Sequence, residues 1–168
     1  MTILALDPGL KLGWATNGTG YHAGQAGVFR VDDWLARYYD GVAYEGHDLL
    51  ARRLSSTRRW LDLVAHYIVP DMLVVEQQPH MGRSGKGSRG FSAHGQINRS
   101  IETVCIELAG DRDILLLRPA PNTWQAWAKR NMPDRLTEWQ TRGRPDDVSA
   151  QMMLAWALAT QKVEREAA

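Results

Sequence analysis

The sequence predicts an α/β fold in which a mixed five-stranded sheet is flanked by helices. Two apolar runs of strand length carry no internal charge, and each ends in a single carboxylate, at Asp7 and at Glu76. Such runs are typical of strands that are buried on both faces. Longer segments with apolar residues at helical spacing are clearest over residues 47–68 and 147–163. The carboxylates at the two strand ends are the chemically notable residues of this pattern.

The bulk composition is that of one ordinary globular domain, which we expect to span residues 1–168. The net charge of +1 does not indicate nucleic-acid binding, so a DNA surface would need local clusters of Lys and Arg. The single cysteine, Cys105, lies in a helical apolar pattern and fits a buried thiol in a reducing compartment. No signal-peptide pattern or membrane-length apolar run is present, which predicts a cytoplasmic protein without a membrane partner.

The N-terminal part is expected to form a three-stranded meander followed by a helix. Three apolar stretches separated by turn residues have strand length: residues 2–7, 12–16 and 23–31. Residues 32–45 mix aromatic and charged side chains and are either an insertion or the lead-in to the next helix. Apolar residues recur at helical spacing over residues 47–68, with arginines between them, and Pro70 ends this helix.

A fourth strand is expected over residues 72–75, and it leads to Glu76 before Pro79. The following residues 79–91 contain four glycines, three cations and a terminal aromatic, which predicts a flexible loop. The loop is either a plain linker or a DNA contact, since its cations can track phosphates and Phe91 can stack on a base. The DNA-binding candidates of this loop are Arg83, Lys86, Arg89 and Phe91.

The next segment is expected to contain two helices around a short strand. Ser92 is predicted to cap a helix that reaches about Ala109, and residues 114–117 to form the fifth strand. Asn122 or Thr123 is predicted to cap the helix that follows.

The chain closes with a polar connector and an apolar helix. Residues 131–144 are rich in arginine and are expected to be a basic connector close to DNA. The final helix is predicted from about Asp147 to Val163, with Asp146 just before it. The helix macrodipole favours acids at this end even without a metal, so an N-cap role is the structural alternative for one of them.

Three acidic sites, at Asp7, at Glu76 and at the Asp146-Asp147 pair, together favour a divalent-metal site. Mg²⁺ takes oxygen ligands and keeps several waters, so few carboxylates suffice when phosphate oxygens supply the rest. Two such ions about 3.5–4 Å apart activate a water and stabilise the leaving oxygen of a phosphodiester. Asp7 alone is also explained as a turn residue before Pro8-Gly9, but the repetition of the pattern favours the metal site.

Four separated motifs occur in a fixed order along the chain: Asp7-Pro8-Gly9 continuing to Gly13-Trp14-Ala15, Val74-Val75-Glu76-Gln77, His94-Gly95-Gln96-Ile97 and Asp146-Asp147-Val148. Together they resemble the motifs of the RuvC family of Holliday-junction resolvases, over nearly the whole chain. The resemblance implies a ribonuclease H-like fold and a homodimeric, Mg²⁺-dependent endonuclease that acts on four-way DNA junctions, with Mn²⁺ able to substitute. It also implies catalytic and metal-binding roles for Asp7, Glu76, Asp146 and Asp147.

The chain departs from the family pattern on its last helix. RuvC-like enzymes usually place a second carboxylate three residues after the first, which puts both on one helical face. Aligned through Asp147, that position is Ala150, which has no metal-binding atom. Either Asp146 and Asp147 both bind the metal, or the fourth metal ligand is absent. Family members also carry a catalytically helpful lysine, for which Lys129 is the nearest candidate, and Lys129 is a DNA-binding candidate as well.

These departures leave two alternatives to a junction resolvase. The first is a junction-binding protein with impaired or absent cleavage, and the second is a general nuclease of branched DNA or RNA–DNA hybrids. The divergent loop and the missing fourth ligand favour a phage-encoded protein, which would act in an infected host, over one from a bacterial cell.

Overall fold

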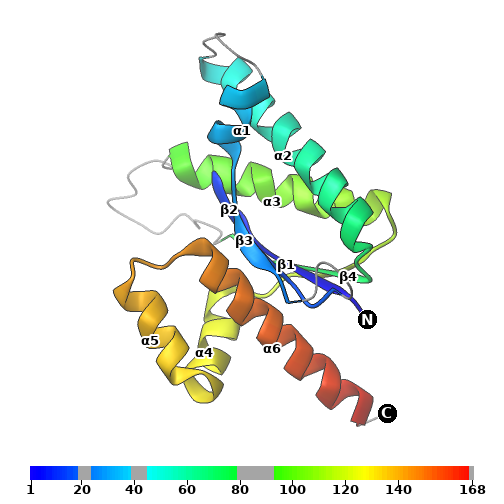
Figure 1. Ribbon diagram of the computed structural model, residues 1–168, viewed down its shortest axis with the longest axis vertical. Helices are drawn as coiled ribbons and strands as arrows, with labels where there is room; N and C mark the ends of the chain where they lie inside the picture. Colours follow the sequence, from blue (N-terminus) through cyan, green and yellow to red (C-terminus); the bar gives the residue numbers. More distant parts are fainter. Residues whose placement is uncertain (19–23, 39–44, 79–92, 167–168) are drawn as a thin grey trace, which may run out of the picture.

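The structure is a computed structural model that describes residues 1–18, 24–38, 45–78 and 93–166 (Figure 1). Over these residues one sheet contains five strands: β1 (Ile3–Asp7), β2 (Lys11–Thr16), β3 (Ala26–Arg30), β4 (Met72–Val75) and β5 (Leu115–Leu117). The strand order is β3-β2-β1-β4-β5. The three N-terminal strands pair antiparallel, whereas β4 runs parallel to both β1 and β5. The mixed five-stranded sheet predicted from the sequence is confirmed.

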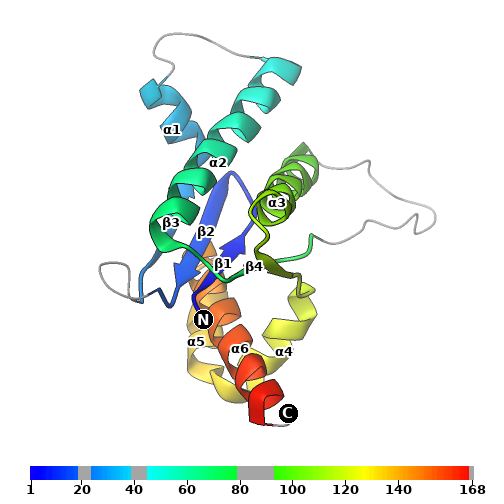
Figure 2. The ribbon, with the colours of Figure 1, turned by 90° about the vertical axis from the view of Figure 1, so that its right-hand side faces the viewer.

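Helices cover both faces of the sheet (Figures 1 and 2). Their bounds are α1 (Val31–Tyr38), α2 (Gly46–Ile68), α3 (Ala93–Asp111), α4 (Pro121–Asn131), α5 (Pro133–Thr141) and α6 (Asp146–Glu166). The first three pack on one face and the last three on the other, so each face has its own hydrophobic core. None of the helices among the described residues is long and apolar enough to cross a membrane.

The two central strands are buried on both faces, as their apolar runs predict. Leu4 and Leu6 of β1 belong to the core under α2 and α3, while Ile3 and Ala5 belong to the core under α6. β4 alternates in the same way. Cys105 is fully buried in α3, and burial raises the pKa of its thiol to about 12, as expected for an unreactive structural cysteine.

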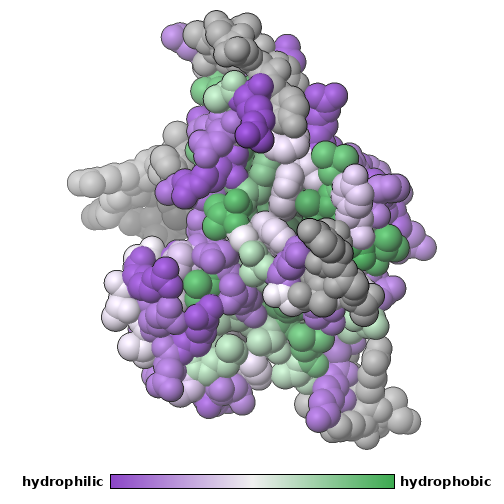
Figure 3. Space-filling view, viewed as in Figure 1, coloured by the Kyte–Doolittle hydropathy of each residue, from purple (hydrophilic) through white to green (hydrophobic). Residues whose placement is uncertain are grey.

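Two predictions made from the sequence were wrong in detail, and one segment that the sequence left open is assigned by the structure. The ambiguous segment after β3 begins with a helix, α1, which buries Val31 and Leu35. The expected basic connector contains α5, which buries Leu136 and Trp139 and is covered outside by hydrophilic residues (Figure 3). Helix α4 begins at Pro121 after Ala120 and has no side-chain cap, because proline at the first position needs no partner for a backbone N–H. The predicted cap at Ser92 and the loop of residues 79–91 lie outside the described residues.

Candidate active site

Asp7 and Glu76 lie beside each other at the carboxyl ends of two parallel strands. The register pairs Leu6 of β1 with Val75 of β4, and the Glu76 N–H donates to the Leu6 carbonyl at 3.1 Å. Side chains alternate along a strand, so Asp7 follows Ile3 and Ala5 toward the α6 face. Glu76 follows Met72 and Val74 toward the same face. Both carboxylates therefore leave the sheet on the side that α6 covers.

Gly13 brings the start of α6 directly onto this edge of the sheet. It pairs with Asp7 across the β1–β2 ladder. A Cβ at Gly13 would lie 2.0 Å from the Asp146 carbonyl oxygen and 2.9 Å from the Asp146 Cβ. Only glycine permits this approach of backbone to backbone. The first residue of α6 is thereby held against the strand next to Asp7.

The three carboxylates of Asp7, Glu76 and Asp146 line one pocket, although they come from β1, the end of β4 and the start of α6. We call it the carboxylate pocket. Two cations, Lys11 and Arg30, line it as well, together with two exposed acids of α1, Asp32 and Asp33. Lys11 and Arg30 face each other across the β2–β3 ladder, so the register places them side by side at the mouth. The sequence interpretation missed both cations, because the signal that joins them is a strand pairing rather than a motif.

Burial and mutual repulsion act together on these acids. Burial raises the pKa of Asp7 well above its ordinary value, and the charges of Glu76 and Asp146 raise it further. Burial also raises the pKa of Glu76, with a contribution from Asp146. The pKa of Asp146 is raised by burial, while nearby Lys11 counteracts the shift. Clusters of acids with raised pKa values are typical of functional sites, since a cation relieves the repulsion.

Two side chains lie beside the acids on the α4–α6 side. The Trp124 indole N–H donates to Glu76 Oε2 at 2.7 Å, which favours the ionised form of Glu76. The Ser149 hydroxyl lies close to Asp7 and lowers the pKa of Asp7 against the effect of burial. Ser149 in turn accepts the Trp139 indole N–H at 2.8 Å. Neither tryptophan nor Ser149 was recognised in the sequence, because no local pattern links them to the strand ends.

The two adjacent aspartates at the start of α6 differ in their position relative to the pocket. Asp146 lines the carboxylate pocket, whereas Asp147 is not among the residues that line it and acts through its charge, which raises the pKa of Asp146. One helical turn after Asp146 is Ser149, the residue whose hydroxyl lowers the pKa of Asp7. Ala150 is fully buried in the protein interior. The residue three positions after Asp146 is thus Ser149, whereas Ala150, three positions after Asp147, lies in the interior.

A buried glutamate ties the end of β4 to α3 and β5. Glu102 of α3 accepts the Gln78 N–H at 3.2 Å and pairs with Arg118 at 2.5 Å. Arg118 directly follows β5, and Gln77 donates its N–H to Pro119 at 2.9 Å. The charge of Glu102 also contributes to the raised pKa of Glu76, after burial. These contacts fix the position of the backbone immediately after Glu76.

The predicted DNA-binding residues are placed only in part. Arg83, Lys86, Arg89 and Phe91 lie outside the described residues. Lys129 is exposed in the last turn of α4 and is not among the residues that line the carboxylate pocket. The role of Lys129 stays a prediction from the resemblance.

The donor set of the carboxylate pocket fits an open, hydrated cation site. Among the described residues, no three His, Cys, Asp or Glu side chains converge tightly enough to hold an ion by themselves. Mg²⁺ does not require such a cage, because it keeps several waters and takes one or two carboxylates together with phosphate oxygens. Asp7, Glu76 and Asp146 offer only oxygen donors, and their repulsion favours a cation between them.

No protein-family model matches the chain, and no curated protein sequence matches it. Solved structures of Holliday-junction resolvases share its fold. Thermus thermophilus RuvC in complex with Holliday junction substrate matches with a TM-score of 0.54 at 14% identity, over 92% of this chain and 90% of that chain. A second Thermus thermophilus RuvC structure matches with a TM-score of 0.54 at 15% identity, over 96% and 97%.

The yeast mitochondrial Holliday junction resolvase Ydc2 matches with a TM-score of 0.57 at 9% identity, over 90% of this chain and 76% of that chain. At these identities the likeness is one of fold. The resemblance to RuvC that the sequence motifs indicate is confirmed at that level.

Proposed function

We propose that this protein is a divalent-metal-dependent, structure-selective endonuclease that resolves four-way DNA junctions by paired symmetric nicks. The observation that supports this most strongly is the meeting of Asp7, Glu76 and Asp146 in one pocket. The fold is shared with Holliday-junction resolvases, one of them solved with its junction substrate. Fold likeness alone would not assign an activity, so the proposal rests on the site.

Asp7, Glu76 and Asp146 would hold Mg²⁺, or Mn²⁺ in its place, and Asp147 would add negative charge beside them. Such ions, when bound, activate a water for in-line attack on a phosphodiester and stabilise the leaving oxygen. Trp124 orients the carboxylate of Glu76 by its hydrogen bond, and the Ser149 hydroxyl lowers the pKa of Asp7 beside it.

Lys11 and Arg30 are placed to bind the phosphate that reacts. Both line the mouth of the carboxylate pocket, and both side chains are basic next to an acidic interior. A phosphodiester that enters would meet the cations at the rim while its scissile oxygen atoms approach the acids. Cleavage in this manner leaves a 5′-phosphate and a 3′-hydroxyl.

We infer a homodimer for the active form. A four-way junction has two-fold symmetry, and two symmetric nicks require two active sites related by the same symmetry. Light scattering with and without junction DNA tests this inference, and a monomer on the junction would contradict it.

The experiment that tests the activity compares labelled four-way junction, fork, duplex and RNA–DNA hybrid in Mg²⁺. We expect paired nicks in opposed strands of the junction and little cleavage of the others. Asp7→Asn should abolish nicking, while Asp113→Asn, a matched change on an exposed turn with φ 51°, should retain it. Nicking by Asp7→Asn at the wild-type rate would rule the site out, and cleavage of all four substrates would favour the general nuclease.

Ser149 supports a second candidate, a junction-binding protein with weak or no cleavage. A hydroxyl stands one helical turn after Asp146, where related enzymes place a carboxylate. Gel shift of the junction without nicking in Mg²⁺ or Mn²⁺, with nicking restored by Ser149→Asp, would support this candidate. Ala150→Asp is a poorer test: both positions are buried, but only Ser149 interacts with Asp7, so a carboxylate at position 150 would be buried without that neighbour.

A further inference from the structure

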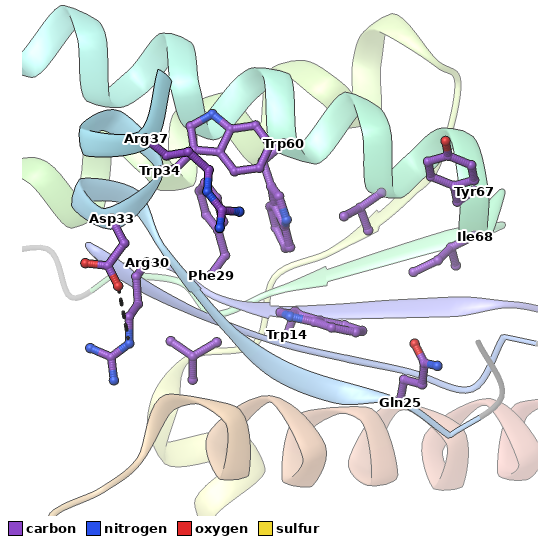
Figure 4. A pocket seen from close by; sticks show the side chains of 12 residues that line it. Trp14, Gln25, Phe29, Arg30, Asp33, Trp34, Arg37, Trp60, Tyr67 and Ile68 are labelled. Atoms are coloured by element: carbon purple, nitrogen blue, oxygen red, sulfur yellow. Dashed lines mark ion pairs between the residues drawn. The ribbon is translucent and has the colours of Figure 1, made fainter. Parts of the chain in front are cut away.

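A second pocket lies on the other face of the sheet, between β2–β3 and α1–α2 (Figure 4). Its walls are aromatic: Trp14, Phe29, Trp34, Trp60 and Tyr67. We call it the aromatic pocket. Only Phe29 of these side chains is buried, and Tyr67 is 67% exposed. Trp14, Trp34 and Trp60 pack against the core with part of each ring accessible, and with Tyr67 they form an exposed aromatic surface of the kind that marks interaction sites.

Trp14 forms a flat floor for this pocket. It pairs with Gly27 across the β2–β3 ladder. A Cβ at Gly27 would lie 3.1 Å from Trp14 Nε1 and 3.3 Å from Cε2, so the indole rests directly on the glycine. Figure 4 shows the indole lying along the strands below Trp60. One face of the ring is thus supported by backbone, and the other side faces the pocket.

Phe29 and Trp60 form a stacked wall above that floor. Their ring centroids are 4.5 Å apart with planes 8° from parallel, and Trp60 lies 6.4 Å from Trp14 at 59°. Trp34 closes the same side edge-on, 5.6 Å from Phe29. These contacts fix the orientation of the rings, so the pocket is a preformed aromatic surface.

The aromatic pocket shares part of its lining with the carboxylate pocket, although the two lie on opposite faces of the sheet. Arg30 and Asp33 line both of them. Arg37 stands at the same end of the aromatic pocket and is exposed (Figure 4). Arg30 and Asp33 are 4.0 Å apart and both are more than half exposed, so their pairing is weak and leaves Arg30 able to bind an anion.

We propose that the aromatic pocket is a nucleobase subsite that takes one unstacked base of a DNA strand whose backbone passes the carboxylate pocket, with Arg30 and Arg37 on the flanking phosphates. This inference rests on the proposed function and extends it to substrate positioning. Bases stack on aromatic side chains without regard to sequence, and arginines at the rim bind the phosphates on either side.

A nucleobase fits these features better than an apolar side chain of a partner protein. Either would contact Trp14 and Trp60, but only a nucleotide also places anionic groups opposite Arg30 and Arg37. Arg30 and Asp33, which line both pockets, bring a strand bound at the aromatic pocket to the edge of the carboxylate pocket. A partner protein would have no reason to approach the acids.

Binding of two labelled single-stranded oligonucleotides of equal length tests the subsite, one with bases and one abasic, in EDTA to prevent cleavage. We expect the full chain to bind the oligonucleotide with bases about 5- to 100-fold more tightly. Tyr67→Ala should remove about 5-fold of that preference and leave abasic binding unchanged. Arg37→Ala should weaken both and reduce the salt dependence by about one phosphate contact. Arg59→Ala, an exposed arginine of α2 that does not line the pocket, is the matched control.

Equal affinity for the two oligonucleotides, or an unchanged preference in Tyr67→Ala with a wild-type melting curve, would overturn the subsite. Binding of an apolar peptide that base-containing DNA does not displace would assign the pocket to a protein partner instead. The two proposals fail separately. Base-dependent binding in a chain that never nicks junctions retains the subsite and removes the nuclease, whereas junction nicking without base preference does the reverse.

Discussion

Gly13 determines how closely α6 approaches the sheet, and through that contact the position of Asp146. Gly13→Ala would place a methyl group 2.0 Å from a backbone carbonyl, which cannot move without displacing the helix. We expect a loss of about 3 kcal/mol of unfolding free energy, at the upper end of overpacking effects, together with loss of nicking. Urea denaturation and the junction assay measure the two effects.

Gly110→Ala is the matched control, since Gly110 lies in α3 with open space around its Cα. It should be neutral or stabilise the protein by up to about 1 kcal/mol, because alanine is the better helix former. Equal stability of the two alanine variants would show that α6 does not depend on the Gly13 contact.

Trp124 adjusts the protonation of Glu76 through one hydrogen bond. Burial raises the pKa of Glu76, and the indole donor lowers it. Trp124→Phe keeps an aromatic ring in the core but removes the donor, so the pKa of Glu76 should rise further. Because an ionised Glu76 is needed to hold a cation, the acid limb of the pH–rate profile should move to higher pH.

Trp127→Phe makes the same change on the same helix, at a residue that is only partly buried. Single-turnover nicking across the pH range compares the two variants. An identical acid limb in wild type and Trp124→Phe would mean that the Glu76 hydrogen bond does not affect catalysis.

At the level of elements, Glu102 connects α3, the end of β4 and the end of β5. Glu102→Gln keeps an acceptor for the Gln78 N–H but removes the ion pair with Arg118. Since Arg118 is 37% exposed, we expect a modest loss of about 1–2 kcal/mol, well below that of a fully buried pair.

Removing the Glu102 charge should also lower the pKa of Glu76, because burial and this charge both raise it. The acid limb of nicking should therefore move to lower pH, opposite to Trp124→Phe. Glu107→Gln, an exposed glutamate of the same helix, is the control for both readouts. A shift of the acid limb in the same direction in Glu102→Gln and Trp124→Phe would contradict this account of the Glu76 pKa.

Elements that follow from one local apolar pattern were predicted correctly from the sequence, whereas an element that depends on tertiary packing was missed. The apolar runs before Asp7 and Glu76 and the stripe of α6 were sufficient to locate these elements. α5 was missed because its two buried residues, Leu136 and Trp139, are outnumbered by polar neighbours. That helix is nevertheless needed for the site, since Trp139 supports Ser149 and its ring packs 5.5 Å from Trp124.

The same limit applies to the start of α6. Two adjacent aspartates are equivalent in a sequence, but only Asp146 lies over Gly13. The choice between them follows from a contact with β2, more than 130 residues away in the chain. Lys11 and Arg30 were missed for the same reason, as were the hydrogen bonds of Trp124 and Ser149. Strand ends were predictable, whereas the partners of those ends required the tertiary structure.

For the molecule as a whole, the carboxylate pocket weakens the metal-free fold. A carboxyl group whose pKa is raised on folding contributes stability below its unfolded pKa and loses that contribution as pH rises through the folded pKa. For Asp7 this loss begins above the ordinary value of 3.8, and Glu76 and Asp146 act in the same direction. Natural active sites commonly trade stability for function in this way.

Asp7→Asn should therefore stabilise the protein in EDTA, because it removes the charge and keeps the shape. Its advantage over wild type should be small near pH 4 and should widen toward neutral pH, where each 1 kcal/mol raises Tm by about 2–4 °C. Mg²⁺ should reverse the order: at about 100 times its Kd it stabilises wild type by about 2.7 kcal/mol, and the variant much less. Thermal melts at several pH values, with EDTA or Mg²⁺, measure both effects without any cleavage assay. Two results together would contradict this account: a wild-type Tm that does not change with Mg²⁺, and an Asp7→Asn variant that is no more stable than wild type in EDTA. They would mean that these acids neither repel one another nor hold a cation.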